Sequence, residues 1–251
     1  MRIDRDSFKE ILDTLLRNKS RTLLTGFGIF WGLFMLLVML GGGQGLKSML
    51  SQEFEGFATN TVILVEMRTT KPWKGLKENR YWSLSYKDVD RLKLMVPELD
   101  VVTPVVSNWG QTALRKERTA DCTIKGVKAD YTKVETPTLK YGRYINETDV
   151  LQERKVCVIG RRVYEALFPE GGDPCGSYIQ AGPVYYRIIG VDFSAGNFSV
   201  NGRSDQTVVI PLSVAQKLFH RGSNVDLVCL TGKPGVKMST LADRIRSIWG
   251  L

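Results

Sequence analysis

Residues 18–40 read NKSRTLLTGFGIFWGLFMLLVML, and the glycine-rich motif GGGQG follows directly at residues 41–45. From Thr22 to Leu40 there are nineteen residues without a charge, and eleven of them are Leu, Ile, Val or Phe. At about 1.5 Å per residue, a helix of this length spans roughly 28 Å, close to the roughly 30 Å hydrocarbon core of a bilayer. The stretch is therefore predicted to cross a membrane once, over residues 22–42.

Two other interpretations of this stretch are weaker. A secretory signal peptide has an apolar core of roughly 7 to 15 residues and ends at a small-x-small cleavage site. Here the apolar core is longer, ends in GGGQGL and follows a charged segment of twenty-one residues. A buried core helix of a soluble protein is disfavoured because no face of the segment is polar. The prediction is an uncleaved transmembrane helix.

The charges on either side of the span predict its orientation. Residues 1–21 carry six Lys and Arg, whereas the twenty residues after Leu40 carry only Lys47. Positively charged residues close to a span tend to stay on the cytoplasmic side. The N-terminus is therefore expected in the cytoplasm, and residues after about 43 beyond the inner (plasma) membrane, which in a bacterium is the periplasm.

Residues 1–21 are predicted to form a cytoplasmic amphipathic helix ahead of the span. Ser7 and Glu10 match a capping box at the start of a helix. The apolar residues that follow recur at helical spacing and so share one face, made of Phe8, Ile11, Leu12, Leu15 and Leu16. We expect this face to lie along the inner leaflet of the membrane or, alternatively, against a neighbouring subunit.

Two groups of glycines have candidate roles. Gly28 and Gly32 form G-x-x-x-G inside the span, a spacing that permits close packing against another helix, although glycine is common in membrane helices and the match can be incidental. After the span, apolar residues at helical spacing predict a helical stalk over residues 43–58. Gly41, Gly42 and Gly43 are the expected hinge of this stalk, since Gly weakens a helix by about 1 kcal/mol relative to Ala.

The rest of the chain, about 210 residues, is long enough for one large domain or two small ones. A β-α-β pattern covers residues 60–106, and alternation of strands and helices returns after residue 204. Residues 107–203 hold short strand candidates separated by turn residues. The expected class is α+β, with an α/β subdomain (residues 59–106 and 204–251) interrupted by a β-rich inserted subdomain (residues 107–203).

Two helices of the α/β subdomain have clear sequence signals. The first is expected at residues 85–96, where Ser85 can cap it and Pro97 ends it. The second is expected at residues 238–250, with an apolar stripe facing a core. That stripe consists of Leu241, Ile245, Ile248 and Trp249.

Composition does not indicate a nucleic-acid partner. The net charge is +9, but the cations are scattered and no nucleic-acid reader motif accompanies them. The densest cluster, residues 68–80, carries five positive charges against Glu78. It is expected to be a solvated loop or, alternatively, to contact anionic lipid or a partner.

No motif of a catalytic, cofactor or metal site is present in the sequence. A G-x-x-x-x-G-K-[ST] motif is absent, so no nucleotide hydrolysis by this chain is predicted. The single histidine, His220, ends a predicted helix, where a cation suits the helix dipole. The four cysteines, at positions 122, 157, 175 and 229, show no C-x-x-C spacing. They are interpreted as small buried hydrophobes, with a disulfide left open.

Several segments in order resemble one family. After the amphipathic helix and NKSRTLLTGFGIFWG, the chain contains IKGVKADY, LKYGRYINETD, KVCVIG, ALFPEG, YRIIGV and VVIPLSVAQKLF. Each motif is weak alone, but their order and spacing resemble the MacB/FtsX-type permeases of ABC transporters over essentially the whole chain.

The resemblance implies a permease subunit that works as a dimer with a separate cytoplasmic ATP-binding subunit. It further implies a porter-like α/β ectodomain with a β-rich insertion, and ATP-driven motion relayed along the first membrane helix to a periplasmic adaptor or cargo. The family carries three further membrane helices after the ectodomain, so the chain is interpreted as the N-terminal part of a permease. The alternative is a single-span protein whose periplasmic domain binds a ligand or partner on its own.

Overall fold

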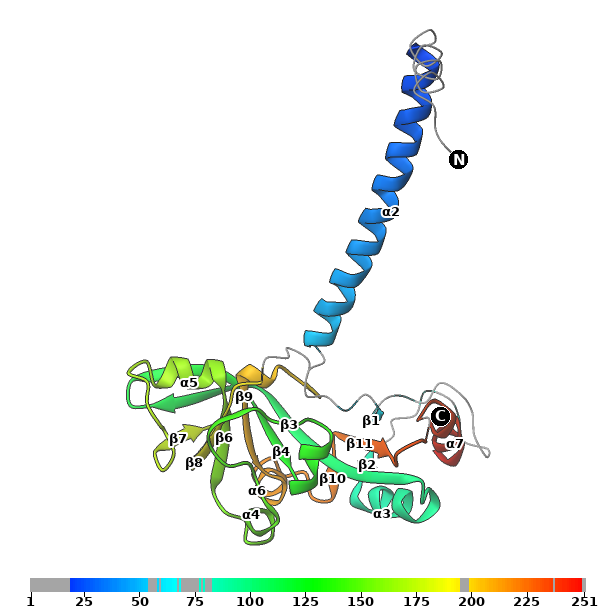
Figure 1. The fold of residues 1–251 in the computed structure, drawn as a ribbon. Coiled ribbons are helices and arrows are strands. Elements are labelled where there is room, and N and C mark those ends of the chain that lie inside the picture. Colours follow the sequence, from blue (N-terminus) through cyan, green and yellow to red (C-terminus); the bar gives the residue numbers. More distant parts are fainter. Residues whose placement is uncertain are drawn as a thin grey trace. The chain divides into compact units, whose positions relative to one another are not determined.

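The computed structural model describes residues 19–53, 58, 60–66, 68, 77, 79, 83–194, 199–236 and 238–249. The chain divides into two compact units, Met1–Gln52 and Glu53–Leu251. The described residues form an N-terminal helix, α2 (Lys19–Glu53), and a mixed α/β domain (Figure 1). The expected fold class, α+β with an apolar N-terminal helix, is thereby confirmed.

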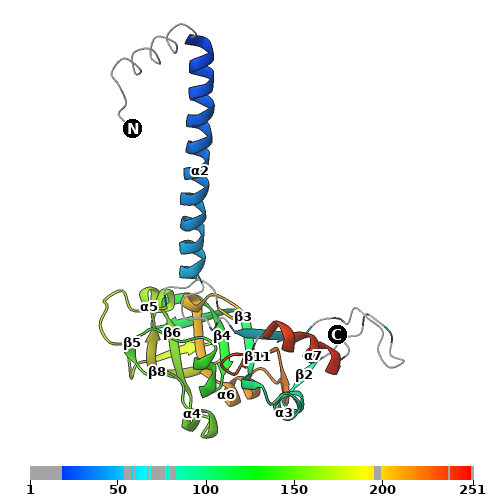
Figure 2. The same cartoon turned by 45° about the vertical axis from the view of Figure 1, so that its right-hand side comes forward.

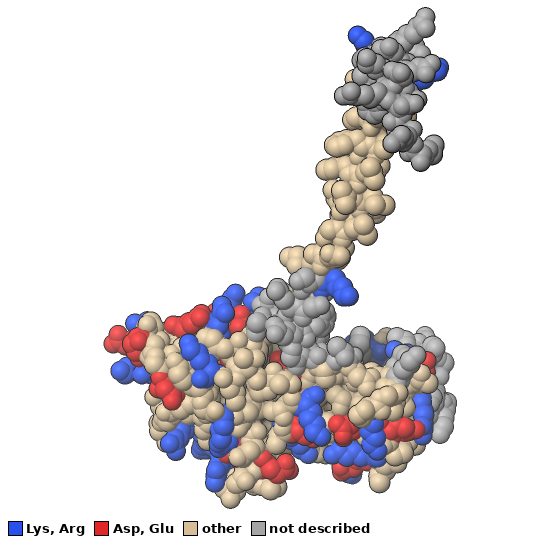
Figure 3. Space-filling model, in the orientation of Figure 1, with Lys and Arg blue, Asp and Glu red and all other residues tan. Residues whose placement is uncertain are grey.

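Helix α2 is 35 residues long, and its middle is apolar on every side. Between Lys19 and Lys47 it is long and apolar enough to cross a membrane, and none of that stretch is buried within the chain. Figure 3 shows it as an uncharged band with cations only near its ends. A helix that exposes apolar side chains on all sides is suited to lipid. The expected span at residues 22–42 lies within this stretch.

The helix runs without interruption through Gly41, Gly42 and Gly43. At about 1.5 Å per residue its whole length is roughly 52 Å, well beyond the roughly 30 Å of a bilayer core. The expected stalk at residues 43–58 is helical up to Glu53, and residues 54–57 lie outside the described residues. A hinge at the three glycines stays a prediction.

The domain is organised around one nine-stranded sheet among the described residues, in the order β1-β11-β3-β4-β9-β6-β8-β5, with β7 paired to β3 and β8. A separate ladder pairs β2 with β10. The strands are β1 (Thr61–Val65), β2 (Leu84–Ser85), β3 (Leu99–Arg115), β4 (Arg118–Val127), β5 (Leu139–Gly142), β6 (Val156–Gly160), β7 (Tyr178–Ala181), β8 (Val184–Asp192), β9 (Thr207–Pro211), β10 (Asn224–Val225) and β11 (Leu227–Gly232).

Five helices and two 3₁₀ turns accompany this sheet in the described part of the domain. They are α3 (Tyr86–Met95), α4 (Glu147–Leu151), α5 (Arg161–Leu167), α6 (Leu212–Leu218), α7 (Met238–Trp249), η1 (Ala129–Lys133) and η2 (Ser204–Gln206). Figures 1 and 2 show α3 and α7 at the β1–β11 end of the sheet and α5 at the other end. Helix α6 packs on β3, β4 and β9.

The β-α-β pattern expected from the sequence is present, but it is split by a strand from the far end of the chain. Both β1 and β3 pair antiparallel with β11, so β1 and β3 are parallel with β11 between them. Helix α3 connects them, and its start is held where the Ser85 N–H donates to Asp88 Oδ2 at 2.9 Å. The position of β11 depends on pairing between residues more than a hundred positions apart, which local patterns do not encode.

The β-rich region closes into a ring of strand pairings. Strand β3 pairs with β4, then β4 with β9, β9 with β6, β6 with β8, and β8 with β7. Strand β7 returns to β3 through the pairs Ala113–Ala181 and Leu114–Gln180. A closed ring leaves no free edge among these six strands, which protects them from pairing with other chains.

Two expected subdomain boundaries are crossed by strand pairing. Strand β3 continues from residue 99 to 115, through the boundary expected at residues 106–107. Strand β9, which the sequence interpretation placed in the α/β part, lies between β4 and β6. Strand β9 therefore pairs with two strands of the expected insertion. The division into an α/β part and a β-rich insertion stays a proposal.

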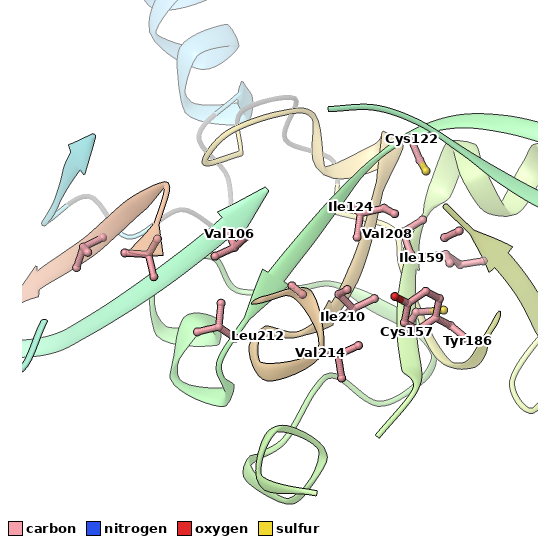
Figure 4. Packing of buried hydrophobic residues seen from close by; sticks show 14 of the residues in the cluster. Val106, Cys122, Ile124, Cys157, Ile159, Tyr186, Val208, Ile210, Leu212 and Val214 are labelled. Atoms are coloured by element: carbon pink, nitrogen blue, oxygen red, sulfur yellow. The ribbon is translucent and has the colours of Figure 1, made fainter. Parts of the chain in front are cut away.

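Buried side chains form two clusters on opposite faces of the sheet strands. The larger combines the interior of the ring with the inner faces of α3, α5, α6 and α7. Figure 4 shows part of it, with Cys122, Ile124, Cys157, Ile159, Tyr186, Val208 and Ile210 gathered from four strands beside Leu212 and Val214 of α6. The smaller cluster lies under η1 and includes Tyr131 and Val134.

The stripe expected on the last helix faces this core. Leu241 and Ile245 are buried, with 6% and 0% of their surface exposed. The side chains of Ile248 and Trp249 lie outside the described residues.

Two motifs noted in the sequence have physical reasons in the fold. In IKGVKADY, a Cβ added at Gly126 would lie 2.3 Å from Ala215 Cβ, so only glycine lets α6 lie this close to β4.

In LKYGRYINETD, Asp149 has no exposed surface, and Arg143 donates to both of its carboxylate oxygens, at 2.5 and 3.0 Å. Burial acts to raise the pKa of Asp149, but hydrogen bonds from Arg143 and Asn146 and the charges of Arg143 and Arg154 outweigh it, so the pKa lies below its usual value.

We predict that Gly126→Ala destabilises the domain by about 1–3 kcal/mol, because the added methyl group overlaps Ala215 and forces α6 away from the sheet. Urea unfolding of the full chain in detergent measures the change. Adding Ala215→Gly should recover part of the loss, although glycine inside α6 itself costs about 1 kcal/mol. Equal stability of Gly126→Ala and the wild type would contradict the close contact.

Candidate functional site

The membrane helix presents a small face beside an aromatic one. At Gly28 and Gly32 no atom lies within 4 Å of where a Cβ would stand. Phe27 and Trp31 each precede one of these glycines in the sequence, and their rings stack with centroids 5.9 Å apart. The ring centroids of Trp31 and Phe34 are 5.7 Å apart. The glycine pair is therefore an open, smooth strip that a second helix could approach closely. Its packing role stays a prediction.

The other membrane-proximal predictions fall on two different parts of the chain. The amphipathic face made of Phe8, Ile11, Leu12, Leu15 and Leu16 lies outside the described residues. At the hinge candidates Gly41, Gly42 and Gly43, a Cβ would meet no described atom within 4 Å.

An ionic network that the sequence interpretation did not anticipate is buried in the domain. Lys125 on β4 is only 2% exposed, and its Nζ lies 2.6 Å from Ser199 Oγ and 3.5 Å from Glu135 Oε2. The hydroxyls of Tyr131 and Ser199 donate to the same Glu135 oxygen, at 2.6 and 3.0 Å. This network ties β4 to η1 and to the segment between β8 and β9.

The sequence did contain a signal for this network. Along β4, Cys122, Ile124 and Gly126 face the larger core, while Thr123 and Lys125 face the other side of the strand. A charged residue within a strand that is buried on both faces needs a buried partner. Sequence alone cannot name that partner, because Ser199 is 74 positions away.

The chemistry of the network is that of a structural ion pair. Lys125 Nζ lies against both Ser199 and Glu135, and the Glu135 carboxylate accepts from the hydroxyls of Tyr131 and Ser199. Burial and the charge of Glu135 raise the pKa of Tyr131 well above its usual value, so its hydroxyl stays a donor. The cavity beside these residues is about 10 Å³, room for one water molecule.

The cysteines are free and mostly buried. Cys122, Cys157 and Cys229 are buried and Cys175 is partly exposed. Burial raises the pKa of the Cys122 and Cys229 thiols to about 12, and that of Cys175 to about 11. Thiols with such pKa values are unreactive at neutral pH, because the thiolate is the nucleophile and metal ligand. Among the residues the structure describes, no group of three or more His, Cys, Asp or Glu could hold a metal ion.

The described surface has a groove with two lobes between α4, α6 and the start of β8. One lobe, of about 430 Å³, is lined by Glu153, Ser213, Gln216, Lys217, His220 and Gly222. The other, of about 290 Å³, is lined by Glu153, Lys155, Val184, Val214, Lys217 and Leu218. Both lobes share Glu153 and Lys217, whose side chains form an ion pair of 2.5 Å between them. Since both partners are substantially exposed, the pair contributes at most about 1 kcal/mol.

Two residues of this groove hold unusual backbone conformations. Glu153 follows the C-cap of α4 and His220 follows the C-cap of α6, and each has φ of 51°. Glycine is the usual residue at that position because a side chain in the left-handed region costs about 1–2 kcal/mol. His220 was expected at the end of a helix, and it lies two residues after the last residue of α6. Its side chain lines the groove.

Comparison with known proteins places these features in context. The model of the MacB-like periplasmic core domain family matches residues 22–248. The macrolide export ATP-binding/permease protein MacB 2 of Aeromonas hydrophila is 28% identical over 235 residues, which are 93% of this chain and 35% of that protein. The pyoverdine export ATP-binding/permease protein PvdT of Pseudomonas syringae is 30% identical over 206 residues, 80% of this chain and 30% of that protein. The chain thus spans about a third of the length of these curated relatives.

Solved structures share the fold. The periplasmic region of MacB from Actinobacillus actinomycetemcomitans matches with a TM-score of 0.61 at 20% identity, covering 78% of this chain and 85% of that one. The extracellular domain of the ABC-type transporter YknZ, from Gram-positive bacteria, matches with a TM-score of 0.59 at 20% identity, covering 76% and 95%. At this identity the likeness concerns the fold.

We expect Lys125→Met to destabilise the domain by about 3 kcal/mol, because Glu135 would remain largely buried without a cation. Chemical unfolding of the full chain in detergent gives the value. The double variant Lys125→Met/Glu135→Leu should recover much of the loss, since both charges are then removed.

Lys133→Met is the matched control for this prediction. It breaks the pair of Lys133 and Asp100, whose side chains are 60% and 46% exposed, and should change stability by no more than about 0.5 kcal/mol. A loss in Lys125→Met no larger than in this control would show that the buried network is dispensable.

Proposed function

The chain belongs to the MacB-like periplasmic core domain family of MacB/FtsX-type ABC permeases, as its motifs indicated, and we propose that it is the N-terminal part of a permease subunit in an ABC-type export or mechanotransmission complex. In this proposal the chain relays ATP-driven motion of a partner ATPase to the periplasm. The relatives named above are export proteins that combine ATP-binding and permease functions, which supports a link to ATP hydrolysis. The names of these relatives do not identify the cargo of this chain.

The observation that carries the proposal is the length and continuity of α2. A bilayer core takes up roughly 20 helical residues, and α2 has 35, so more than a dozen helical residues extend past the apolar stretch. A hydrogen-bonded helix moves as a stiff element, so displacement at one end is passed to the other. Gly41, Gly42 and Gly43 would be the soft point at which this element bends.

The proposed topology follows from the flanking charges and the family. The N-terminus lies in the cytoplasm, α2 crosses the inner membrane, and the residues after about 43 lie in the periplasm. The family name itself refers to a periplasmic core domain. The amphipathic face at Phe8 to Leu16 would then lie at the inner leaflet, close to where an ATPase acts.

The proposed partners are four. A separate cytoplasmic ATP-binding subunit supplies the motion, and a second permease copy, identical or related, packs against Gly28 and Gly32. Membrane lipid surrounds the remaining faces of α2. In the periplasm, an adaptor or cargo receives the movement of the domain. Nucleic acid is not among the proposed partners.

Affinity purification of the protein from membranes in mild detergent tests the function directly. We expect a P-loop ATP-binding subunit to co-purify in stoichiometric amount, together with two permease copies per complex. Recovery of the protein alone, still anchored in the membrane fraction, would instead favour the single-span alternative in which the periplasmic domain binds a partner independently.

Cysteine cross-linking in membranes tests the packing face. Gly28→Cys and Gly32→Cys should form disulfide-linked dimers under mild oxidation, because the small face lets the second helix approach closely. Phe30→Cys, which lies on the other side of α2, is the matched control and should cross-link much less. The unaltered chain controls for its own four cysteines. Equal cross-linking at residues 30 and 32 would refute the glycine face.

A further inference from the structure

The groove between α4 and α6 has the features of a binding site that the proposed relay does not use. Its two lobes meet at the Glu153–Lys217 ion pair. The side chains of Lys217 and Glu153 are 70% and 43% exposed, so this pair is weak and its partners can be exchanged. We infer that this groove binds an acidic segment of a partner polypeptide, which inserts an apolar side chain into one lobe and places a carboxylate against the basic groups.

The charge of the groove favours an acidic occupant. Glu153 is the sole carboxylate among the described lining residues, and Lys217 already neutralises it. Lys155 forms no ion pair with any residue the structure describes. A carboxylate entering the groove would therefore meet an unmatched ammonium at Lys155 and a second one at Lys217 that can change partner.

A buried hydrogen-bond donor also favours an occupant that carries an acceptor oxygen. Gln216 Nε2 is buried at the wall of the larger lobe and has no hydrogen-bond partner among the described residues. A buried amide donor without an acceptor is unfavourable, so a carboxylate that reached Gln216 would remove this cost. The imidazole of His220, held on the same wall by an uncommon backbone conformation, can also donate to an incoming oxygen.

The smaller lobe explains why the occupant should be a polypeptide. Val184, Val214 and Leu218 are apolar lining residues of this lobe, beside Lys155 and Lys217, a setting that suits an aliphatic or aromatic side chain. A free anion would use the basic groups and leave the apolar lining uncovered. An extended segment with apolar and acidic residues close in sequence fills both lobes, in the manner of peptide recognition through side-chain pockets.

The inference rests on the proposed function only for the compartment, the periplasm, in which the partner would be met. It concerns the domain surface, whereas co-purification and cross-linking test the membrane helix and the ATPase. A negative result in one experiment therefore leaves the other unaffected.

Selection of a random 12-residue peptide library on the full chain in lipid nanodiscs tests the inference. We expect enriched peptides to combine Asp or Glu with at least one Leu, Ile or Phe. Fluorescence polarisation with an enriched peptide should show binding weakened at least tenfold by Lys155→Glu/Lys217→Glu. Leu218→Ser should weaken it as well, and raising the salt concentration should weaken it severalfold.

Lys87→Glu/Lys93→Glu on the exposed face of α3 is the matched control, since it makes the same charge change away from the groove and should leave binding unchanged. Enrichment of no peptide, enrichment without acidic bias, or equal binding to Lys155→Glu/Lys217→Glu would each overturn the inference. Full displacement of the peptide by millimolar inorganic phosphate would show a small-anion site in place of a polypeptide groove, and would overturn it too.

Discussion

Strand β3 is the element on which the rest of the domain depends. Its first half pairs with β11 in the α/β part, and its second half lies between β4 and β7 in the ring. Because side chains alternate between faces, a slip of β3 by one residue would exchange the side chains that face the two buried clusters. The short pairing between Ala113 and Ala181 matters beyond its size, since it closes the ring and leaves no free edge among its six strands.

Close approaches and buried charges explain why the family motifs contain the residues they do. Gly126 is required where α6 touches β4, and Arg143 is required where Asp149 is buried at the start of α4. Lys125 is held by Glu135, by the hydroxyl of nearby Tyr131 and by the hydroxyl of Ser199 from a distant segment. Burying an ion pair is costly unless its hydrogen bonds are completed, so such a network favours a single arrangement of the segments that supply its parts.

The two units of the chain meet different solvents. Helix α2 exposes large apolar side chains all round, which water disfavours and lipid accepts. The domain buries its apolar residues in two clusters and exposes charges. The proposed relay would need both properties in one chain, with a stiff helix in lipid and a folded domain in water. The groove between α4 and α6 adds a place where that domain could engage a partner.

The sequence by itself determined the elements that depend on local physics. The apolar run of α2, the helix capped at Ser85, the β-branched strands and the buried stripe of Leu241 and Ile245 were all predictable, because hydrophobic periodicity and capping act over a few residues. Tertiary structure alone decided the insertion of β11 between β1 and β3, the closure of the ring, the partners of Lys125 and the groove beside His220. Each of these depends on contacts between residues far apart in the chain. Such contacts produce no periodic pattern in the local sequence, so a local pattern cannot predict them.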